Sequence, residues 1–215
     1  MNKAIIFDLD GTLIDSLPDI FDNITIMLEK FGYEKRTYKE VMSYIGNGAR
    51  MLVKSSLPEG ETEERIDECL GYYNGIYTSG GSPKTKLFDG IKETLVELKK
   101  RGYKLAILTN KPQITTDNVY KTYMSDLGFD EVVGQRPGAK IKPDPTEALK
   151  ILSKLSVKVE SAYFIGDGET DAELAKRGNL QGISVLWGYR DKATLAQYGA
   201  VNFAEKPSDL LEFIK

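Results

Sequence analysis

The chain has 215 residues, no histidine and one cysteine, and its formal net charge is −3. Without histidine there is no Ser-His-Asp triad and no histidine-ligated zinc. One cysteine permits neither an internal disulfide nor a thiolate metal cluster. Catalysis must therefore use carboxylates, hydroxyls, amides, lysine or arginine, and a hard cation bound by oxygen atoms fits that inventory.

Hydrophobic residues make up 41% and charged residues 28% of the chain, the composition of a globular protein. The length indicates one large domain or one domain with an insertion. The slightly acidic balance disfavours nucleic-acid binding, because a phosphate backbone attracts clustered positive charge. The apolar runs are too short for a membrane span, and the N-terminal residues lack a signal-peptide pattern. We expect a cytoplasmic, reduced protein with neither nucleic-acid nor membrane partners.

The first predicted element is a short buried strand over residues 4–9, followed by an Asp-Gly turn signal. Apolar residues then recur at helical spacing over residues 18–31. Ser16, with Asp19 three positions later, is typical of a helix start. The pattern therefore predicts a helix soon after the first strand.

Helical patterns continue to about residue 78, and a loop or hinge composition follows at residues 79–83. The first strand is thus separated from the other predicted strands by about 70 residues that are nearly all helical. We interpret residues 16–83 as an inserted all-α cap domain. Residues 1–15 and 84–215 then form an α/β core domain.

After the proposed cap, strands alternate with helices. The predicted strands are at residues 104–108, 131–134, 162–165 and 182–187, with a further short strand near the C-terminus. Helical segments are predicted around residues 91–98, 110–127, 146–155 and 169–177, with two more near the C-terminus. Strands alternating with helices of ~10–15 residues imply crossover units and a parallel sheet covered on both faces. The expected fold class is α/β, Rossmann-like.

Polar residues gather where the predicted strands end, which is where open parallel sheets bind ligands. Asp8 and Asp10 are two positions apart, so both carboxyl groups lie within one strand end and turn. Two carboxylates that close ionise together only at an electrostatic cost, and Asp167 at another strand end adds a third. The cluster predicts a cation, and ligands that are all oxygen select Mg²⁺ or a similar hard ion.

Phosphate-binding groups accompany these carboxylates. Thr109 and Asn110 end another strand and can donate to phosphate oxygens, while Lys142 adds a positive charge. Gly11 and Thr12 expose backbone N–H groups at a tight turn, a possible anion nest. Each short motif alone is more often a turn or loop than a site. Their joint position at strand ends favours a phosphoryl-transfer site.

These motifs resemble those of the haloacid dehalogenase-like hydrolase superfamily. FDLDGT is similar to the first family motif, LTN with Thr109 to the second, KPDP with Lys142 to the third and GDGETD to the fourth. The resemblance covers the whole chain, and the helical insertion lies where type I caps of that family are placed. YIGNGA and FDLDGTLIDSLPDI also resemble bacterial phosphoglycolate phosphatases.

The resemblance implies a role for each acidic residue. Asp8 would be the nucleophile that forms an aspartyl-phosphate. Asp10 would be the general acid for the leaving alcohol and then the base that activates water. Mg²⁺ would be held by the Asp8 carboxylate, the Asp10 backbone carbonyl and the Asp167 carboxylate. Asp171 would support the metal site or Lys142.

The remaining motif residues would hold the transferring phosphoryl group. These are Thr109, Asn110 and Lys142, with Gly11 at the first motif. Asp10 disfavours a true dehalogenase, whose reaction needs neither Mg²⁺ nor that acid. Gly168 stands where serine is common in the family, which removes a hydroxyl but no metal ligand.

The expected substrate is a small phosphorylated metabolite, with phosphoglycolate favoured. Its carboxylate calls for a second cation near the leaving group, for which Arg50 is the candidate, with Lys54 behind it. The alternative is that both lie on a solvated helix face. Cys69, in a predicted cap helix, is interpreted as a thiol without a chemical role.

Other functions stay open at this point. A phosphosugar phosphatase or mutase, or a pyrophosphatase, could use the same scaffold. A non-catalytic phosphoacceptor or binding module is the least favoured, because receiver domains lack the long cap. A monomer or a homodimer is expected.

Overall fold

A parallel β-sheet forms the centre of the protein. The computed structural model describes residues 2–80 and 83–215, and within them six strands pair in the order β5-β4-β1-β6-β7-β8. The strands are β1 (Lys3–Phe7), β4 (Tyr103–Pro112), β5 (Glu131–Gln135), β6 (Ala162–Gly166), β7 (Gln181–Val185) and β8 (Phe203–Ala204). Every pairing between them is parallel. The predicted α/β class is confirmed.

The order of the strands fixes where a site can form. β1 pairs with β4 on one side and with β6 on the other. The chain therefore fills one half of the sheet first and then crosses β1 to fill the other half. Ligands of such sheets bind at the carboxyl ends of the strands where the order reverses. That point lies here at the ends of β1, β4 and β6.

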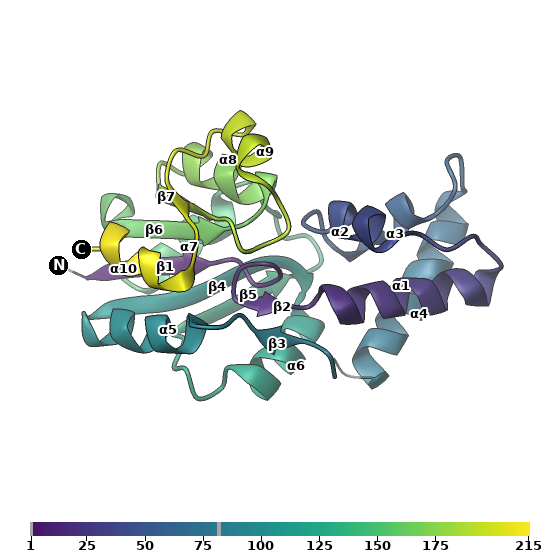
Figure 1. The fold of residues 1–215 in the computed structure, drawn as a ribbon, viewed down its shortest axis with the longest axis horizontal. Coiled ribbons are helices and arrows are strands. Elements are labelled where there is room, and N and C mark those ends of the chain that lie inside the picture. Colours follow the sequence, from purple (N-terminus) through teal and green to yellow (C-terminus); the bar gives the residue numbers. More distant parts are fainter. Residues whose placement is uncertain (1, 81–82) are drawn as a thin grey trace.

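Helices cover both faces of the sheet (Figure 1). α5 (Ile91–Lys100), α6 (Gln113–Tyr123) and α10 (Leu210–Phe213) share one apolar cluster with the sheet, whereas α7 (Thr146–Lys154) and α8 (Glu169–Arg177) share another. Successive residues of β1 point to opposite faces, so Ile5 and Phe7 belong to the first cluster and Ala4 and Ile6 to the second. α9 (Lys192–Gln197) and the 3₁₀ turns η1 (Val159–Ser161) and η2 (Pro207–Asp209) complete this region.

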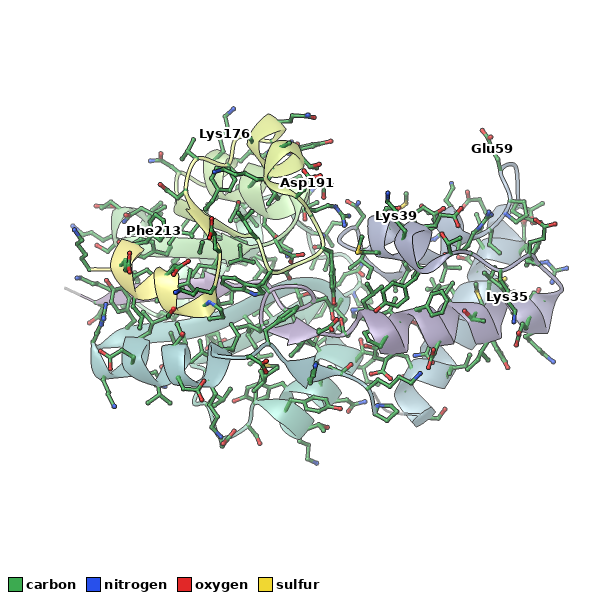
Figure 2. The ribbon with its side chains drawn as sticks, viewed as in Figure 1. Lys35, Lys39, Glu59, Lys176, Asp191 and Phe213 are labelled. Carbon is green, nitrogen blue, oxygen red and sulfur yellow. The ribbon has the colours of Figure 1, made fainter. Side chains whose placement is uncertain are left out.

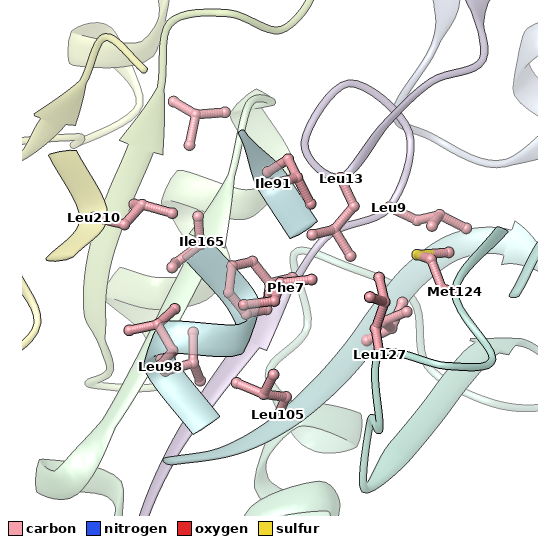
Figure 3. Packing of buried hydrophobic residues seen from close by; sticks show 14 of the residues in the cluster. Phe7, Leu9, Leu13, Ile91, Leu98, Leu105, Met124, Leu127, Ile165 and Leu210 are labelled. Carbon is pink, nitrogen blue, oxygen red and sulfur yellow. The ribbon is translucent and has the colours of Figure 1, made fainter. Parts of the chain in front are cut away.

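Phe7 lies at the centre of the larger cluster. It is fully buried, and Figure 3 shows it surrounded by side chains from the sheet, from helices and from the loop after β1. The labelled neighbours include Leu105 and Ile165 on the two strands that flank β1, and Leu98 on α5. Full burial of such a side chain stabilises the fold by roughly 1.5–3 kcal/mol. The cluster thus holds rigid the strand that carries the first motif.

Four helices between β1 and α5 form a separate unit beside the sheet (Figure 1). They are α1 (Leu17–Phe31), α2 (Tyr38–Tyr44), α3 (Ala49–Ser56) and α4 (Glu63–Gly80). They enclose an apolar cluster of their own, which includes Cys69. The labelled charged side chains Lys35, Lys39 and Glu59 point outward from this unit in Figure 2. Among the described residues, no helix is long and apolar enough to cross a membrane.

A short antiparallel ribbon marks the place where the chain leaves the sheet and returns. It pairs β2 (Ile14–Asp15) with β3 (Lys86–Leu87), and the sequence pattern did not predict it because each strand has only two residues. The loop expected at residues 79–83 begins late, because α4 continues to Gly80. Residues 81 and 82 lie outside the described residues.

The predicted start of the first helix is right in position and wrong in its contacts. α1 begins after Ser16, but the Ser16 hydroxyl makes no capping bond and donates instead to Asp10 Oδ1 at 2.6 Å. Asp19 accepts hydrogen bonds from the returning chain, from the Thr85 amide and hydroxyl at 2.6 Å each and from the Lys84 amide. Both side chains therefore join helix α1 to the rest of the protein.

Replacement of Asp19 should destabilise the protein. Asp19→Ala leaves the buried Thr85 N–H without an acceptor, and we expect the free energy of unfolding to fall by about 1–3 kcal/mol. Urea unfolding measures this loss. The control is Asp22→Ala, which removes an exposed carboxylate paired with Lys84 and should cost at most about 1 kcal/mol. Equal losses in the two variants would contradict the assigned role of Asp19.

Candidate active site

Three strand ends and one loop bring the predicted motif residues together. Asp8 follows β1, Thr109 and Asn110 lie near the end of β4, and Asp167 follows β6. Lys142 comes from the loop before α7. β4 is longer than predicted, and its register is irregular between Leu108 and Pro112. This irregularity places the second motif inside the strand end rather than in a loop after it.

A cluster of buried carboxylates forms the centre of the site. Asp8, Asp167 and Asp171 each offer an oxygen, and these atoms lie within 4.8 Å of one another. The Lys142 ammonium is 2.7 Å from an oxygen of Asp8 and 2.7 Å from one of Asp171. All four side chains are at least nine-tenths buried. One ammonium thus faces three carboxylates away from bulk water.

The electrostatic cost of this arrangement appears in the pKa values. Burial, and after it the negative charge of the nearby Asp171, raises the pKa of Asp8 to about 8 even though Lys142 acts in the opposite direction. Burial and Asp171 also raise the pKa of Asp167 to about 7. For Lys142, burial acts to lower the pKa, but Asp171 and Asp8 together raise it above its ordinary value. A second positive charge would relieve both Asp8 and Asp167.

The donor atoms fit a hard divalent cation. Asp8 Oδ1 is buried and accepts no hydrogen bond, because Lys142 approaches it at ion-pair distance without hydrogen-bond geometry. Asp167 is held in place by the Thr12 hydroxyl and the Tyr189 amide, each at 2.9 Å. All candidate ligands are oxygens, the type that Mg²⁺ and Ca²⁺ take. A cation between Asp8 and Asp167 would therefore meet one oxygen that is held by an ion pair alone and one carboxylate that two donors hold in place.

Asp171 has a different set of contacts. Its Oδ1 accepts from Lys142 at 2.7 Å, and its Oδ2 accepts from the Gly168 amide at 2.9 Å. Both oxygens are therefore engaged without a metal. Asp171 orients the lysine and the loop at the start of α8, which agrees with the supporting role that the resemblance implies.

Two glycines make this close packing possible. A Cβ on Gly11 would lie 2.2 Å from Asp167 Oδ2, and the backbone at Gly11 has a φ of +83° that disfavours other residues. A Cβ on Gly166 would lie 2.3 Å from Asp171 Cγ. The glycine of the first motif is therefore required by the close approach of Asp167, and the glycine of the fourth by the Asp171 side chain, which lies against the end of β6 from the start of α8.

Asp10 lies beside this cluster and is held by two donors. Ser16 Oγ donates to its Oδ1 at 2.6 Å, and Lys111 Nζ lies 3.0 Å and 3.2 Å from its two oxygens. Lys111 also donates to the hydroxyl of Tyr77 on α4 at 2.8 Å. Sequence reasoning missed Lys111, although its place directly after Thr109-Asn110 was an available signal.

Asn110 positions neighbouring backbone in this structure. Its side-chain oxygen accepts from the Lys142 amide at 2.9 Å, and its side-chain nitrogen donates to the carbonyls of Lys142 and Gly46 at 3.1 Å and 2.8 Å. The phosphate contact expected from the sequence stays a prediction. Asn110 fixes Lys142 and ties the loop between α2 and α3 to the sheet.

Arg190 makes a second connection between the helices and the sheet domain. Its Nε donates to Glu169 at 2.7 Å, at the start of α8. Its guanidinium also donates to three carbonyls at the end of α2, those of Met42, Ser43 and Ile45, at 2.8–3.1 Å. The sequence analysis did not single out this residue, since a lone arginine in a loop carries no motif.

Arg50 is not brought to the site. Its guanidinium forms ion pairs with Glu63 and Asp67 on α4, at 2.7 Å and 2.9 Å, and its side chain is 40% exposed. Lys54 joins the same group through Glu63. Neither residue lines the cavity at the strand ends. Their location agrees with the alternative interpretation, a solvated helix face.

The cavity between the sheet and the helical unit has an empty volume of about 540 Å³, including its open mouth. Its polar floor comes from the strand ends and the loop before α7, with Asp8, Asp10, Thr109, Asn110, Lys111 and Lys142. Its opposite wall is largely apolar and comes from α1, α3, α4 and the loop before α3, with Ile20, Ile45, Leu52, Tyr73 and Tyr77 among its residues.

The comparisons with known proteins agree with this geometry. A family model described as "Haloacid dehalogenase-like hydrolase" matches residues 5–185, so the chain belongs to that family. The phosphoglycolate phosphatase of Psychrobacter arcticus is 30% identical over 99% of this chain and 95% of its own. That of Aquifex aeolicus is 34% identical over 87% of this chain and 86% of its own. A haloacid dehalogenase-like hydrolase of Streptococcus pneumoniae superposes with a TM-score of 0.88 at 27% identity, covering 100% of this chain and 99% of its own.

Divalent cations should stabilise the protein more at high pH than at low pH. Without a cation the folded pKa values of about 8 for Asp8 and about 7 for Asp167 exceed the unfolded value of about 3.9, so their contribution to stability falls as pH rises from 4 to 8. Bound Mg²⁺ offsets this loss. At a fixed concentration, 100 times its Kd at pH 8, it should raise Tm by about 5–10 °C at pH 8, and by less at pH 5.5, where its affinity is lower.

Thermal melts with Mg²⁺ and with EDTA at the two pH values measure this effect. Asp167→Ala removes one candidate ligand and should abolish most of the difference. A Tm shift of equal size at both pH values, or a Tm shift that persists in Asp167→Ala, would contradict the assignment of the cluster as a cation site.

Loss of Arg190 should loosen the end of α2. Arg190→Ala removes hydrogen bonds from a charged donor, and such bonds contribute roughly 1.5–3 kcal/mol each. We expect amide hydrogen exchange over residues 42–49 to become at least about 10-fold faster. Arg65→Ala, which removes an exposed pair with Glu68 on α4, is the matched control. Unchanged exchange in the Arg190 variant would exclude this anchoring role.

Proposed function

We propose that the protein is a Mg²⁺-dependent phosphatase that hydrolyses small phosphomonoesters through an aspartyl-phosphate on Asp8, with phosphoglycolate as the favoured substrate. The observation that carries this proposal is the environment of the Asp8 carboxylate. One of its oxygens is buried, accepts no hydrogen bond, and lies within a cluster of acidic residues that could hold a cation. The nearby Lys142 ammonium neutralises charge at the same point.

The first half of the reaction needs a nucleophile and an acid. An oxygen of Asp8 attacks phosphorus, the bond to the leaving oxygen breaks, and Asp10 gives its proton to that oxygen. The products are an aspartyl-phosphate and a free alcohol. Asp10 lies two residues after Asp8 and lines the same cavity, so it is near the leaving oxygen of a substrate bound there.

The second half regenerates the enzyme. Asp10, now ionised, accepts a proton from water as the water attacks phosphorus. The bond from phosphorus to Asp8 breaks, and inorganic phosphate leaves. Thr109 and Lys142 line the cavity where the phosphoryl oxygens would lie. Phosphoryl transfer depends mainly on positioning and charge neutralisation, so these groups suffice.

Mg²⁺ held by Asp8, Asp167 and the Asp10 carbonyl would neutralise phosphoryl charge and allow the Asp8 oxygen to approach an anion. Thr12 and the Tyr189 amide fix the Asp167 carboxylate for that purpose. Asp171 keeps Lys142 charged and oriented. Asp8, which carries the nucleophilic oxygen, has the fewest hydrogen bonds of these carboxylates.

We further propose that residues 16–83 act as a cap over the catalytic core, residues 1–15 and 84–215. The apolar cluster of α1 to α4 is separate from those of the sheet, which supports two units. Contacts of Asn110 and Arg190 with the loop around Gly46 hold the units together. Such a lid excludes water and large substrates, in agreement with a small phosphomonoester. The names of the relatives favour phosphoglycolate among these.

A phosphate-release screen tests the proposal. Wild-type protein should release inorganic phosphate from phosphoglycolate in the presence of Mg²⁺, and EDTA should abolish the release. Asp8→Asn removes the nucleophile and should lower kcat by at least about 10³-fold, given the scale of losses when covalent catalysis is removed. Asp22→Asn, an exposed position on α1, is the matched control and should keep full activity.

Two outcomes would contradict the proposal. Retained activity in Asp8→Asn would exclude the aspartyl-phosphate. Transfer of phosphate between sugar positions without net release would instead identify a mutase.

A further inference from the structure

A second cation lies in the cavity, away from the acidic cluster. Among the described residues that line the cavity, Lys111 and Lys142 carry the positive charges. Lys142 is engaged by Asp8 and Asp171 at the phosphoryl end. Lys111 lies instead between Asp10 and helix α4, so it faces the space that a leaving group would occupy.

Lys111 is buried to a degree that is unusual for a lysine. Its side chain is 6% exposed, and its ammonium lies 4.4 Å from the centre of the Tyr77 ring. The ammonium is paired with the Asp10 carboxylate at 3.0 Å and 3.2 Å and with the Tyr77 hydroxyl at 2.8 Å, so its charge is offset within the protein. Lys111 also lines the cavity, where an anionic ligand can reach it. Its position therefore suits a role in binding.

Asn74 supplies an independent observation on the same wall. It lies one turn from Tyr77 on α4 and lines the cavity, and its Oδ1 is buried without a hydrogen-bond partner. A buried polar atom without a hydrogen-bond partner destabilises the fold unless a ligand or water satisfies it. A ligand with a polar group at this point would satisfy the amide, either through its oxygen or, after rotation of the side chain, through its NH₂ group.

We propose that Lys111 and Asn74 form a subsite for a carboxylate on the leaving group of the substrate. This inference rests on the proposed phosphatase function. It makes Lys111 and Asn74 the residues that discriminate between substrates by their leaving groups. The ammonium binds one carboxylate oxygen by charge and hydrogen bond. The Asn74 amide, rotated to present NH₂, donates to the same carboxylate.

The position of Lys111 also limits the length of the leaving group. Its Nζ lies 3.0–3.2 Å from the oxygens of Asp10, the residue that protonates the leaving oxygen. The leaving oxygen and the carboxylate must therefore be close together in one molecule. A carboxylate bonded directly to the carbon that bears the ester oxygen satisfies this, so the ligand class is the 2-phosphorylated short-chain hydroxy acid. Sugar phosphates place no anion there.

The same contact couples substrate choice to catalysis. Without substrate, Lys111 and Ser16 occupy the oxygens of Asp10. A substrate carboxylate gives Lys111 a new anionic partner, which lets it release Asp10. The Asp10 carboxyl group is then free to reach the leaving oxygen. A neutral leaving group offers Lys111 no such partner.

The test compares two substrates of similar size, phosphoglycolate and ethyl phosphate, which has no carboxylate. Lys111→Met removes the charge and keeps the length of the side chain. We expect the ratio of kcat/KM for phosphoglycolate to that for ethyl phosphate to fall by about 10- to 100-fold. Lys111→Arg should recover part of the ratio. Arg50→Met, which removes a cation that is outside the cavity, should leave the ratio unchanged.

A variant at Asn74 provides a second test of the subsite if Lys111→Met fails to fold. Asn74→Ala should lower the same ratio by about 3- to 10-fold, because one neutral hydrogen bond contributes roughly 1 kcal/mol. An equal fall for both substrates in every variant would mean that Lys111 and Asn74 only position other groups, and would overturn the subsite.

Binding separates this inference from the proposed function. Calorimetric titration of phosphoglycolate into Asp8→Asn protein needs no turnover. Adding Lys111→Met to that protein should weaken binding by at least about 10-fold. If wild-type protein releases no phosphate, the proposed function fails, but weaker binding in the double variant still supports the subsite. Equal affinity with and without Lys111 overturns it.

Discussion

The structure depends on one electrostatic constraint, the burial of Asp8, Asp167 and Asp171 around the single ammonium of Lys142. Carboxylates with so little water favour their ionised form only if further positive charge is supplied. The raised pKa values of Asp8 and Asp167 reflect this shortage of positive charge. Other features follow from it: glycines that let the loops approach, donors that orient Asp167, and an Asp8 oxygen without a hydrogen bond. A bound cation would supply the positive charge that these carboxylates lack.

The helical unit contributes to the same site rather than only covering it. Tyr77 on α4 contacts Lys111, which contacts Asp10, and Ser16 at the start of α1 contacts Asp10 from the other side. Tyr189 links the two units again, because its amide binds Asp167 while its hydroxyl accepts from the amides of Ser16 and Leu17 at 3.0 Å and 3.1 Å. Motion of the helices would therefore change the surroundings of the proposed acid and of a candidate metal ligand together. Under the proposed cap function, this coupling would let the helical unit influence both substrate entry and reaction.

The sequence was sufficient for the features that local patterns determine. Alternating strand and helix periodicity predicted the α/β class, and the motif residues at the strand ends converge as expected because parallel strands share one carboxyl edge. Residues whose roles depend on long-range contacts were not predictable. Ser16 has the pattern of a helix cap but donates to Asp10, and Arg190 makes its contacts with carbonyls about 145 positions away. Arg50 was chosen for its charge and its place near a glycine turn, but helix α3 directs it toward α4. Among the described residues, the cations that line the cavity are Lys111 and Lys142.

The central claim is that the cluster makes Asp8 a nucleophile, and trapping its phosphorylated form tests that claim most directly. Protein mixed with phosphoglycolate and Mg²⁺ is quenched in acid within the first turnover and reduced with borohydride, which converts an acyl phosphate into an alcohol. Peptide mass spectrometry then locates the change. The account predicts that Asp8 becomes homoserine in substrate-treated protein and not in the control without Mg²⁺. Turnover with Asp8 unmodified, or with the change at another carboxylate, would contradict it.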